Sequence, residues 1–399
     1  ADEFGRSFSV VTRQEIEERG LQTVQQALES LPGISINGTG PNDRDIRIRG
    51  GESNHVLVLF DGKRLSAGDS GYSLRGLDIN NVERIEVIRG PQSVPFGTDA
   101  ASGVVNIVTR QARAGMSIGG QIEIGEGGRE SLYVTHGTDV SDFSLSLSNA
   151  YDEGFDFSGD GGEKDSTSWE SVASKASTQL TNYLKVGYSL RVADSGYDFD
   201  NETFLLGDTE TTRDNYVFDD VTKFEKLLER SWSTFVEHES FGGSVAHRLQ
   251  ADVTSNQTSN SGISDQQTEI FKYRGQFALD AAPSDSSDQL VSLLLETKTD
   301  SAGSSDQERD NDSIAVDYRG QVAKGLTVQS GARLDTSDRF ADAVTWNVAS
   351  SYYLQPDVRI KASVGRAVVY PSFFDIYGAE FEAFLPGSKD SVYRPTNSV

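Results

Sequence analysis

The sequence predicts an α+β domain in residues 1–113, followed in residues 114–399 by strands of a transmembrane antiparallel β-barrel. Two observations predict this division. Apolar residues in the first part follow helical spacing or short strand runs, whereas after about Gly115 they alternate with polar residues at a period of two. The links between the alternating segments are in turn short and long, which is typical of outer-membrane barrels. We count about 13 such segments up to Arg366.

The amino-acid composition excludes some kinds of site and partner. The chain has 399 residues and no cysteine, which excludes disulfides and cysteine-bound metals. Residues 1–113 contain 13 Lys and Arg against 15 Asp and Glu, and the remainder contains 23 against 46, so the net charge of -25 lies almost wholly in the second part. Such a surface repels polyanions, and we expect no nucleic-acid partner. The sequence lacks the apolar run of about 18 residues that a membrane helix needs, whereas a spanning strand needs only about 9–11 alternating residues.

The first domain opens with two helix signals. Thr12 and Glu15 fit a capping box, as do Thr23 and Gln26. After the second box, apolar residues with helical spacing stand at Val24, Ala27, Leu28 and Leu31, and Pro32-Gly33 is expected to end that helix. Asp61-Gly62 is a turn signal between extended segments. We expect strands at Ile46–Arg49, His55–Phe60, Arg84–Arg89 and Gly103–Thr109.

The second part alternates most clearly in four segments: Phe143–Leu147, Leu184–Val192, Trp346–Leu354 and Val358–Val364. Short links are expected at Thr181-Asn182, Ala323–Gly325 and Gln355–Asp357. Long polar links are expected at Asp152–Ser168, Asp194–Thr222, Ser255–Thr268 and Thr299–Asp312. A soluble β-sandwich or solenoid also alternates polar and apolar residues. The asymmetry of the links and the number of strands favour the barrel.

Three segments of the first domain resemble the plug of TonB-dependent receptors, with the cobalamin receptor branch as the nearest likeness. They are "VVTRQEIEERGLQTVQQALESLPGISI" (Val10–Ile36), "IRIRGGESNHVLVLFDGKRL" (Ile46–Leu65) and "VERIEVIRGPQSVPFGTDAASGVVNIVTR" (Val82–Arg110). The barrel resembles the family more weakly, and "ASVGRAVVYPSFFDIYG" (Ala362–Gly378) is a degraded match to a family segment. The resemblance implies an α+β plug inside a barrel of about 22 strands, of which about 13 are present.

The resemblance also implies active uptake of a scarce, large ligand across the outer membrane of a Gram-negative bacterium. Its partners would be TonB, energised through ExbB and ExbD, the ligand, and the lipid and lipopolysaccharide of the membrane. Residues 1–9 do not resemble a TonB-binding segment, and residue 1 is Ala. We therefore expect the sequence to be a fragment that lacks this segment and about nine barrel strands.

The family pairs plug arginines with barrel glutamates, and the resemblance carries this role to Arg49 and Arg89, which precede glycines at strand ends. Their partners would lie in barrel strands that this sequence lacks. Because a buried arginine needs a carboxylate or several carbonyls, such pairs would hold the plug in the lumen. The alternative is that both are ordinary surface arginines.

Two loops of the first domain are candidates for ligand contact at the outer face. Both are rich in small polar residues, so their backbone can approach a ligand closely. In Tyr72 we expect an aromatic ring that stacks on a flat macrocycle or an aromatic siderophore. The alternative is that these loops are simply solvated turns. The candidate residues are Asn42, Asp43 and Arg44 in the first loop, and Ser66, Asp69, Ser70 and Tyr72 in the second.

Aspartates in two long loops of the barrel suit Ca²⁺, because clustered hard oxygen ligands on flexible loops favour this ion. In the cobalamin branch, aspartates of these two loops bind calcium and order the loops. The candidates are Asp156, Asp160 and Asp165 in the first loop and Asp198 and Asp200 in the second. The spacing is not that of an EF-hand. The alternative is an acidic surface loop in an acidic chain.

Enzymatic functions find no support, since G-x-S-x-G, HExxH and P-loop motifs are absent from the sequence. The alternative from another class is a surface-exposed β-rich binding or adhesion protein without a transport role. Within the transport class the alternative ligand is a ferric siderophore. Acidic loops disfavour a highly anionic siderophore unless cations screen them, which favours cobalamin or a related corrinoid.

Overall fold

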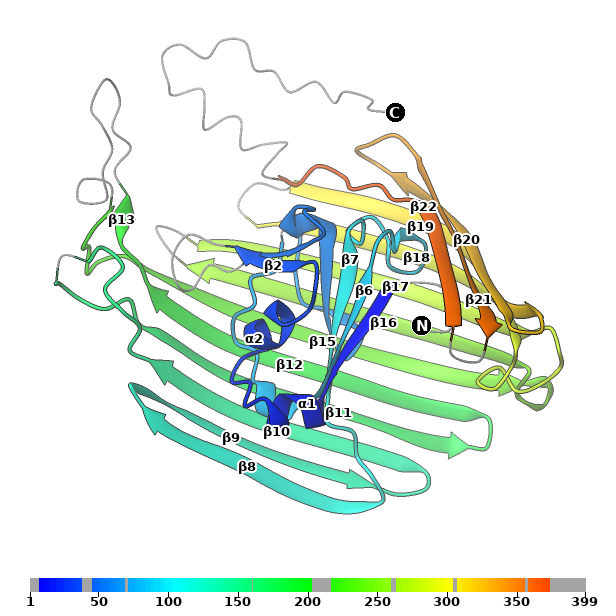
Figure 1. Cartoon of the computed structure of the whole chain (residues 1–399), viewed down its shortest axis with the longest axis horizontal. Coiled ribbons are helices and arrows are strands. Elements are labelled where there is room, and N and C mark those ends of the chain that lie inside the picture. Colours follow the sequence, from blue (N-terminus) through cyan, green and yellow to red (C-terminus); the bar gives the residue numbers. More distant parts are fainter. Residues whose placement is uncertain are drawn as a thin grey trace, which may run out of the picture.

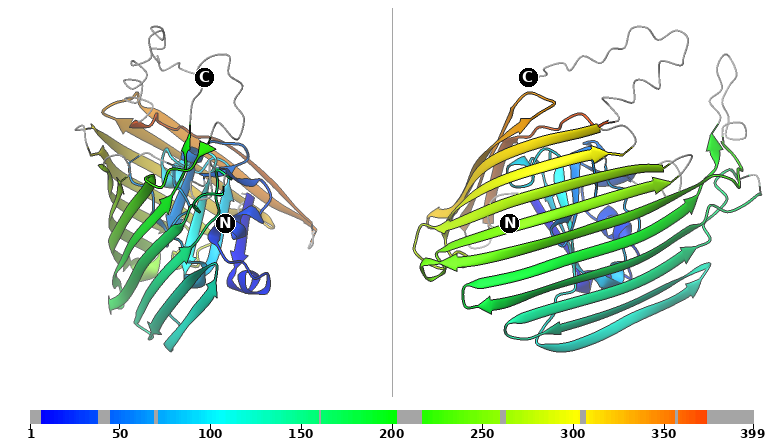
Figure 2. Two further views of the ribbon diagram at one scale, coloured as in Figure 1. Left: turned by 90° about the vertical axis from the view of Figure 1, so that its left-hand side faces the viewer. Right: turned by 180° about the vertical axis from the view of Figure 1, so that it is seen from behind.

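The computed structural model describes residues 7–37, 45–68, 71–159, 161–202, 217–259, 263–303, 307–355 and 358–373. A small mixed domain lies against the concave face of a large curved sheet (Figure 1). Seen from behind and from the side, the sheet wraps around this domain like part of a cylinder wall (Figure 2). We call the small domain the plug and the large sheet the barrel wall. No helix in the described ranges is long and apolar enough to cross a bilayer.

The plug contains a five-stranded sheet in the order β1-β6-β7-β4-β5, in which only β4 and β7 are parallel. A separate hairpin pairs β2 with β3. Its helical elements are α1 (Arg13–Glu18), α2 (Val24–Glu29), α3 (Ser93–Phe96) and the 3-10 turns η2 (Ser53–His55) and η3 (Ile79–Asn81). Its strands are β1 (Ser7–Thr12), β2 (Ile34–Asn37), β3 (Asp45–Ile48), β4 (Val56–Phe60), β5 (Lys63–Arg64), β6 (Val82–Arg89) and β7 (Gly103–Thr109).

Helix α1 begins at the predicted capping box. The Thr12 hydroxyl accepts a hydrogen bond from the Glu15 amide, and the Glu15 carboxylate accepts one from the Thr12 amide at 2.8 Å. The second box is only half formed, because the Gln26 side chain accepts from the amide of Gln22 instead of Thr23. Helix α2 ends at Glu29, so Leu31 lies just beyond the helix that its spacing predicted, although it still packs on the core.

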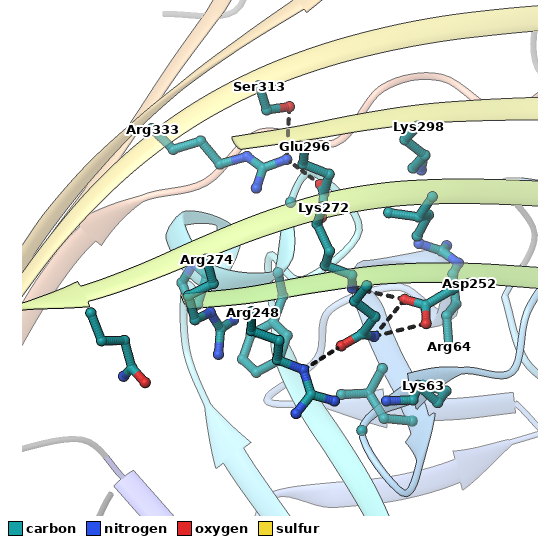
Figure 3. A pocket seen from close by; sticks show the side chains of 18 of the residues that line it. Lys63, Arg64, Arg248, Asp252, Lys272, Arg274, Glu296, Lys298, Ser313 and Arg333 are labelled. Atoms are coloured by element: carbon teal, nitrogen blue, oxygen red, sulfur yellow. Dashed lines mark hydrogen bonds and ion pairs between the residues drawn. The ribbon is translucent and has the colours of Figure 1, made fainter. Parts of the chain in front are cut away.

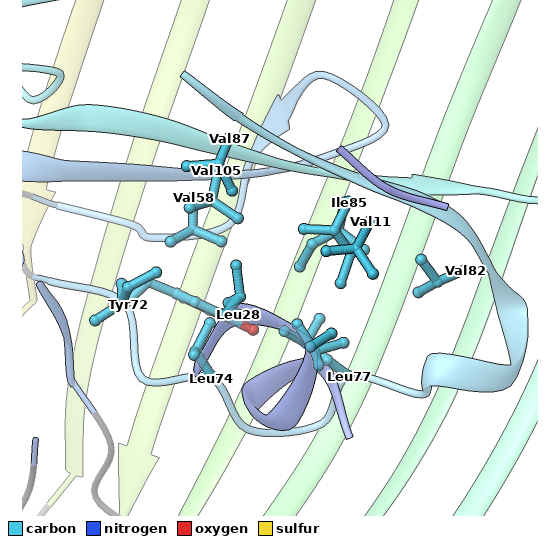
Figure 4. Packing of buried hydrophobic residues seen from close by; sticks show 14 of the residues in the cluster. Val11, Leu28, Val58, Tyr72, Leu74, Leu77, Val82, Ile85, Val87 and Val105 are labelled. Atoms are coloured by element: carbon cyan, nitrogen blue, oxygen red, sulfur yellow. The ribbon is translucent and has the colours of Figure 1, made fainter. Parts of the chain in front are cut away.

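The plug core forms between the sheet and α2. Val58, Val87 and Val105 from the sheet face Leu28 of α2 (Figure 4). Leu74 and Leu77, from the segment between β5 and η3, complete the cluster. The strands supply mainly β-branched residues that fit a pleated surface, and α2 supplies Val24, Ala27 and Leu28. This core is complete within the plug, so the domain packs by itself and meets the barrel wall through its surface.

The turn between β4 and β5 is a tight two-residue hairpin. Asp61 and Gly62 have φ values of 50° and 76°, the left-handed conformations that a type I′ turn requires. The Asp61 carboxylate accepts hydrogen bonds from the amide and the hydroxyl of Thr109 at 2.9 and 2.6 Å. The predicted Asp-Gly signal is therefore confirmed, and its side chain fastens the hairpin to the end of β7.

The barrel wall is a single antiparallel sheet of 13 strands in the order β22-β21-β20-β19-β18-β17-β16-β15-β12-β11-β10-β9-β8. Every pair follows the chain except β12 with β15, which a connection containing the small hairpin β13 (Asn201–Glu202) and β14 (Val217–Phe218) separates. A 3-10 turn η4 (Phe241–Gly243) joins β15 to β16. The strands are β8 (Gly115–Gly125), β9 (Gly127–Gly137), β10 (Ser141–Asp152), β11 (Thr167–Thr181), β12 (Leu184–Asp198), β15 (Phe224–Ser240), β16 (Val245–Ser259), β17 (Ile263–Ala278), β18 (Gln289–Ala302), β19 (Gln307–Ala323), β20 (Leu326–Ser337), β21 (Ala343–Gln355) and β22 (Val358–Arg366).

The two faces of the wall differ in chemistry, as the period of two predicts. In β21, Ala343, Thr345 and Asn347 are buried, while Val344, Trp346 and Val348 are 40–50% exposed on the other face. The same exposed apolar face continues through Tyr188, Leu190, Trp232, Leu249, Phe271, Leu295 and Ile314. An apolar outer band and a polar inner face are what a membrane barrel presents to lipid and lumen.

Several strands are longer than the sequence predicts. The expected loop Ser255–Thr268 is mostly strand, because β16 continues to Ser259 and β17 begins at Ile263. The expected loop Thr299–Asp312 is likewise shortened by β18 and β19. These predictions were wrong because alternation of apolar residues reports only the lipid-facing part of a strand. Beyond it, polar residues continue the hydrogen-bonded ladder in water.

Candidate functional site

The predicted ligand-contact residues fall into two groups. Asn42, Asp43, Arg44, Asp69 and Ser70 lie outside the described residues. Ser66 and Tyr72 are described, and both are buried, with 4 and 3% of their surface exposed.

Tyr72 is part of the plug core and does not present a free ring (Figure 4). Its hydroxyl donates to the carbonyl of Arg75 at 3.2 Å and to the Glu229 carboxylate of β15 at 3.3 Å. Burial, followed by the neighbouring Glu229 carboxylate, raises the pKa of the Tyr72 phenol. The expected exposed, ligand-stacking ring is thus wrong for this structure. A tyrosine ring gains more from a dry environment with one polar partner than from the surface.

Around Tyr72 the plug contacts a buried ion pair of the barrel wall through hydrogen bonds. Arg191 of β12 lies 3.3 Å from Glu229, and both side chains are nearly inaccessible. The Arg191 guanidinium also donates to the carbonyl of Gly76 at 2.9 Å. A side chain at Gly76, whose φ is 64°, would meet the guanidinium at 3.4 Å. Glycine therefore allows the plug backbone to approach the wall closely.

A second contact connects the plug to the outer end of the same strands. Arg75 lies 2.9 Å from Glu225 of β15, and its guanidinium lies 4.7 Å from the centre of the Tyr197 ring of β12. Charge and ring together fix the arginine more firmly than an exposed ion pair would.

The largest network centres on Asp99, which follows α3. Its carboxylate pairs with Arg64 of β5 within the plug and with Lys298 of β18 at 3.1 Å across the interface. Lys298 also lies 2.9 Å from Asp300, which in turn pairs with Arg309. Burial by itself would raise the pKa of the Asp99 carboxyl, but the adjacent Arg64 and Lys298 cations hold it well below its usual range.

Two further contacts fasten the β4–β5 hairpin and the segment after it. Lys175 of β11 lies 2.9 Å from the Asp61 carboxylate at the hairpin tip. Thr254 and Thr268 donate to the carbonyls of Arg64 and Gly68 at 3.0 and 3.3 Å. With the hydrogen bonds between Gln22 and Arg129 of β9 and between Asn81 and Ser146 of β10, these contacts tie the plug to the wall from β9 to β18.

The two arginines predicted to hold the plug do not take part in this network. Arg49 is exposed, with a φ of 54° at the end of β3. Arg89 is 7% exposed and donates to the Ser9 hydroxyl at 2.7 Å, while its Nε and Nη2 have no hydrogen-bond partner among the described residues. No carboxylate of the described residues pairs with either arginine, so their role stays a prediction.

The acidic loops do come together. The carboxylates of Asp156, Asp200 and Asp219 approach one another within 4.8 Å. Burial foremost, and then the Asp200 and Glu163 carboxylates, raise the pKa of Asp165 to about 6. Asp198 accepts a hydrogen bond from the Ser166 hydroxyl at 2.6 Å, and Asp160 lies outside the described residues. Concentrated negative charge of this kind can hold a divalent cation.

Asp219 was not among the sequence candidates. It follows Asp200 by 19 positions and stands in a plain "VFDDV" segment. The hairpin β13–β14 returns it to the cluster, where the Ser158 hydroxyl and the Glu163 amide donate hydrogen bonds to its carboxylate at 2.9 and 3.1 Å.

A plug lying in the lumen of an outer-membrane-type β-wall and fastened to it by buried ion pairs defines a plugged-barrel receptor. Residues 1–104 match the model of the TonB-dependent Receptor Plug Domain, and residues 119–397 match the TonB dependent receptor-like β-barrel. The second match covers more than half of the chain, which therefore belongs to the TonB-dependent receptor family of the outer membrane.

Two similar proteins carry different descriptions. The chain is 42% identical over 113 residues to the iron-regulated outer membrane virulence protein of Vibrio cholerae, covering 26% of this chain and 17% of that protein. It is 22% identical over 386 residues to the vitamin B12 transporter of Photobacterium profundum, covering 93% of this chain and 60% of the transporter.

The siderophore receptor PirA of Acinetobacter baumannii superposes with a TM-score of 0.74 at 17% identity, covering 93% of this chain and 62% of that one. At this identity the likeness concerns the fold alone. The chain spans less than two thirds of the length of each of these three proteins.

Proposed function

We propose that the chain is part of a receptor that captures a scarce, large ligand at the outer face and passes it inward by active uptake. TonB, energised through ExbB and ExbD, would act on the plug. One observation supports this proposal: a folded domain lies against the inner face of the wall and is fastened to it by ion pairs with β11, β15 and β18. Because breaking buried pairs is costly, passage needs an input of energy to move the plug.

For the ligand we propose cobalamin or a related corrinoid. The vitamin B12 transporter of Photobacterium profundum aligns along 93% of this chain, which supports the choice. The carboxylates around Asp200 also disfavour a highly anionic ligand at the loops. A ferric siderophore is the second candidate, and the 42% identity over 113 residues to an iron-regulated outer membrane virulence protein favours it.

We further propose that Ca²⁺ binds between the two acidic loops. Asp156, Asp200 and Asp219 would supply the ligands, with Asp165 and Asp198 nearby. Hard carboxylate oxygens are the ligands that Ca²⁺ prefers, and the ion would remove the repulsion among them. The ordered loops would then form one side of the ligand site, with Asn42, Asp43 and Arg44 of the plug on another.

The ligand is tested with the intact receptor in detergent, titrated with cyanocobalamin and with a panel of ferric siderophores, each with and without Ca²⁺. We expect cyanocobalamin to bind, and to bind more tightly with Ca²⁺. Binding of a siderophore alone would replace the corrinoid by the second candidate. Uptake of the bound ligand by cells with and without TonB then tests the energy coupling, and equal uptake in both would contradict it.

The calcium site is tested by Asp219→Asn, with Asp139→Asn in an exposed turn far from the cluster as the control. We expect Ca²⁺ to raise the melting temperature of the unaltered receptor and of the control but not of Asp219→Asn. If Ca²⁺ stabilises all three equally, the cluster is an ordinary acidic surface.

A further inference from the structure

A cavity of about 560 Å³ lies between the plug and the barrel wall. The β4–β5 hairpin and α3 form its plug side, and strands from β15 to β20 form its wall side (Figure 3). Its lining includes Glu239, His247, Gln276 and Arg319, which stand near the strand ends next to the short connections. At β15 to β17 the cavity therefore lies toward the opposite end of the wall from the acidic loops, and at β18 to β20 it extends to Lys298, Asn311 and Asp335 in the other half of the strands.

Two cations in this cavity have no ion-pair partner within 4 Å among the described residues. They are Lys63 of the hairpin and Arg274 of β17, and neither is joined to a neighbour by a hydrogen bond or ion pair (Figure 3). The Lys63 ammonium is partly covered, and the Arg274 side chain stands in the open part of the lumen. Unpaired cations enclosed by protein attract an anion more strongly than cations in bulk water.

The carboxylates that face these cations are already engaged elsewhere. Near Lys63, Asp61 holds Lys175 at 2.9 Å and Asp252 holds Lys272 at 3.0 Å. Near Arg274, Glu296 holds Arg333 at 2.7 Å, and Asp317 accepts hydrogen bonds from the side-chain amide of Gln329 at 3.1 and 3.3 Å.

Arg248 lies near both unpaired cations and has Glu237 as its own partner. Lys63 and Arg274 thus each leave one positive charge without an ion-pair partner close to Arg248, within a lining whose carboxylates otherwise balance its cations. Guanidinium groups beside an ammonium match the planar oxygens of a carboxylate or phosphate.

We propose that this cavity is an oxyanion-binding site, in which Lys63 and Arg274 hold a carboxylate or phosphate group between plug and wall. The site lies on the inner side of the plug, where a solute that has passed the outer loops meets the short-turn end of the wall. It does not depend on which ligand the outer loops capture. If no oxyanion binds in this cavity, the uptake proposal still stands, because oxyanion binding and ligand uptake are measured in separate experiments.

The test uses competitive acetylation of lysines in the intact receptor in detergent, with each site quantified by mass spectrometry. The probes are inorganic phosphate and citrate, each compared with chloride at the same ionic strength. Burial, helped by Arg248 and Lys272, lowers the pKa of Lys63 to about 8, so this lysine reacts readily at pH 8. A bound oxyanion stabilises the ammonium and covers it, and we expect the rate at Lys63 to fall at least threefold.

Lys226, an exposed lysine of β15, serves as the internal control and should react equally in all three salts. In Arg274→Gln we expect the protection of Lys63 to disappear, and in Arg274→Lys to return in part. The unchanged rate at Lys226 and an unchanged melting temperature show that the variants are folded. Equal rates at Lys63 in phosphate, citrate and chloride would overturn the proposal, and so would protection that survives in Arg274→Gln.

Discussion

Removing the charge of Asp99 should loosen the plug from the barrel wall more than any change at the plug surface. The change Asp99→Asn keeps the shape of the side chain but removes the anion between Arg64 and Lys298. Those two cations are only 8 and 9% exposed, so they cannot be solvated where they stand. They would remain as buried, poorly compensated charges in the closed state.

The size of the effect follows from the remaining partners. Removing one member of a buried ion pair costs about 3–5 kcal/mol. Lys298 keeps Asp300 at 2.9 Å, and the Arg64 Nε still donates to the carbonyl of Ser66 at 2.9 Å. We therefore expect a cost at the lower end of this range, about 3 kcal/mol. This corresponds to a roughly 100-fold increase in the population of the open state, in which the plug has moved away from the wall.

Because the sequence contains no cysteine, a single introduced cysteine can be labelled specifically. Ala67 is fully buried in the segment whose next residue, Gly68, accepts a hydrogen bond from Thr268 of the wall. A maleimide can label Ala67→Cys only when this segment leaves the wall. When closing is faster than labelling, the labelling rate follows the open population, so Asp99→Asn should raise it roughly 100-fold.

The control is Glu83→Gln in the same domain. Glu83 lies 3.7 Å from Arg113, whose side chain is 89% exposed, and such pairs contribute only about 0.2–1 kcal/mol. We expect a change in labelling rate of less than about fivefold there. A similar rate in Asp99→Asn and Glu83→Gln would refute the idea that the Asp99 network holds the plug. In a receptor that already carries Arg64→Met, the effect of Asp99→Asn should shrink, because the two residues share one interaction.

Three other predictions concern separate parts of the molecule. Acetylation of Lys63 should rise as the pH passes about 8, below the ordinary lysine pKa of 10.5, and a midpoint near 10.5 would contradict the argument that burial lowers this pKa. Between these two pH values the folded state binds fewer protons than the unfolded chain, so the stability of the plug should rise with pH in that window. Phe271→Arg on the apolar outer face should lower the free energy of unfolding of the wall by about 2–4 kcal/mol, measured by urea unfolding in bilayers. Glu308→Arg lies on the same face beyond the apolar band and should lower it by at most about 1 kcal/mol. Arg75→Met should speed amide exchange of residues 72–76 about tenfold by removing the pair with Glu225 and the contact with Tyr197, and unchanged exchange would show that this contact does not hold the segment.

The strands of the barrel wall could be predicted because the side-chain period of a strand is two. Once Trp346 and Val348 face lipid, Thr345 and Asn347 must face the lumen, and the sequence alone determines both faces. The ends of the strands could not be predicted in this way. Where β16 ends and β17 begins, Gln257–Ser259 and Ser264–Gln266 are all polar, so no contrast between neighbouring residues marks where pairing stops.

The plug–wall contacts carry little sequence signal, because their members are far apart in the chain. Asp99 and Lys298 are separated by 199 positions, and each occupies an ordinary polar stretch. Asp156 and Asp200 were predicted from their loops, whereas Asp219 needed the β13–β14 pairing to be recognised. The prediction that the Tyr72 ring is exposed was wrong because its Gly- and Ser-rich sequence surroundings resemble a solvated turn. In the structure the ring packs inward in the same cluster as Leu28 and Leu74.

Strand β1 has a mechanical consequence. It is the edge of the plug sheet, bonded on one side only, to β6. Ion pairs to the barrel lie instead near the opposite edge, at Asp61 in the turn before β5 and at Asp99, which is paired with Arg64 of β5. A load applied to β1 and directed away from β6 would break the ladder one pair at a time, beginning at Ser7 and Arg89, before any strain reached the far edge. The sheet can therefore be peeled from one side while the other side stays anchored.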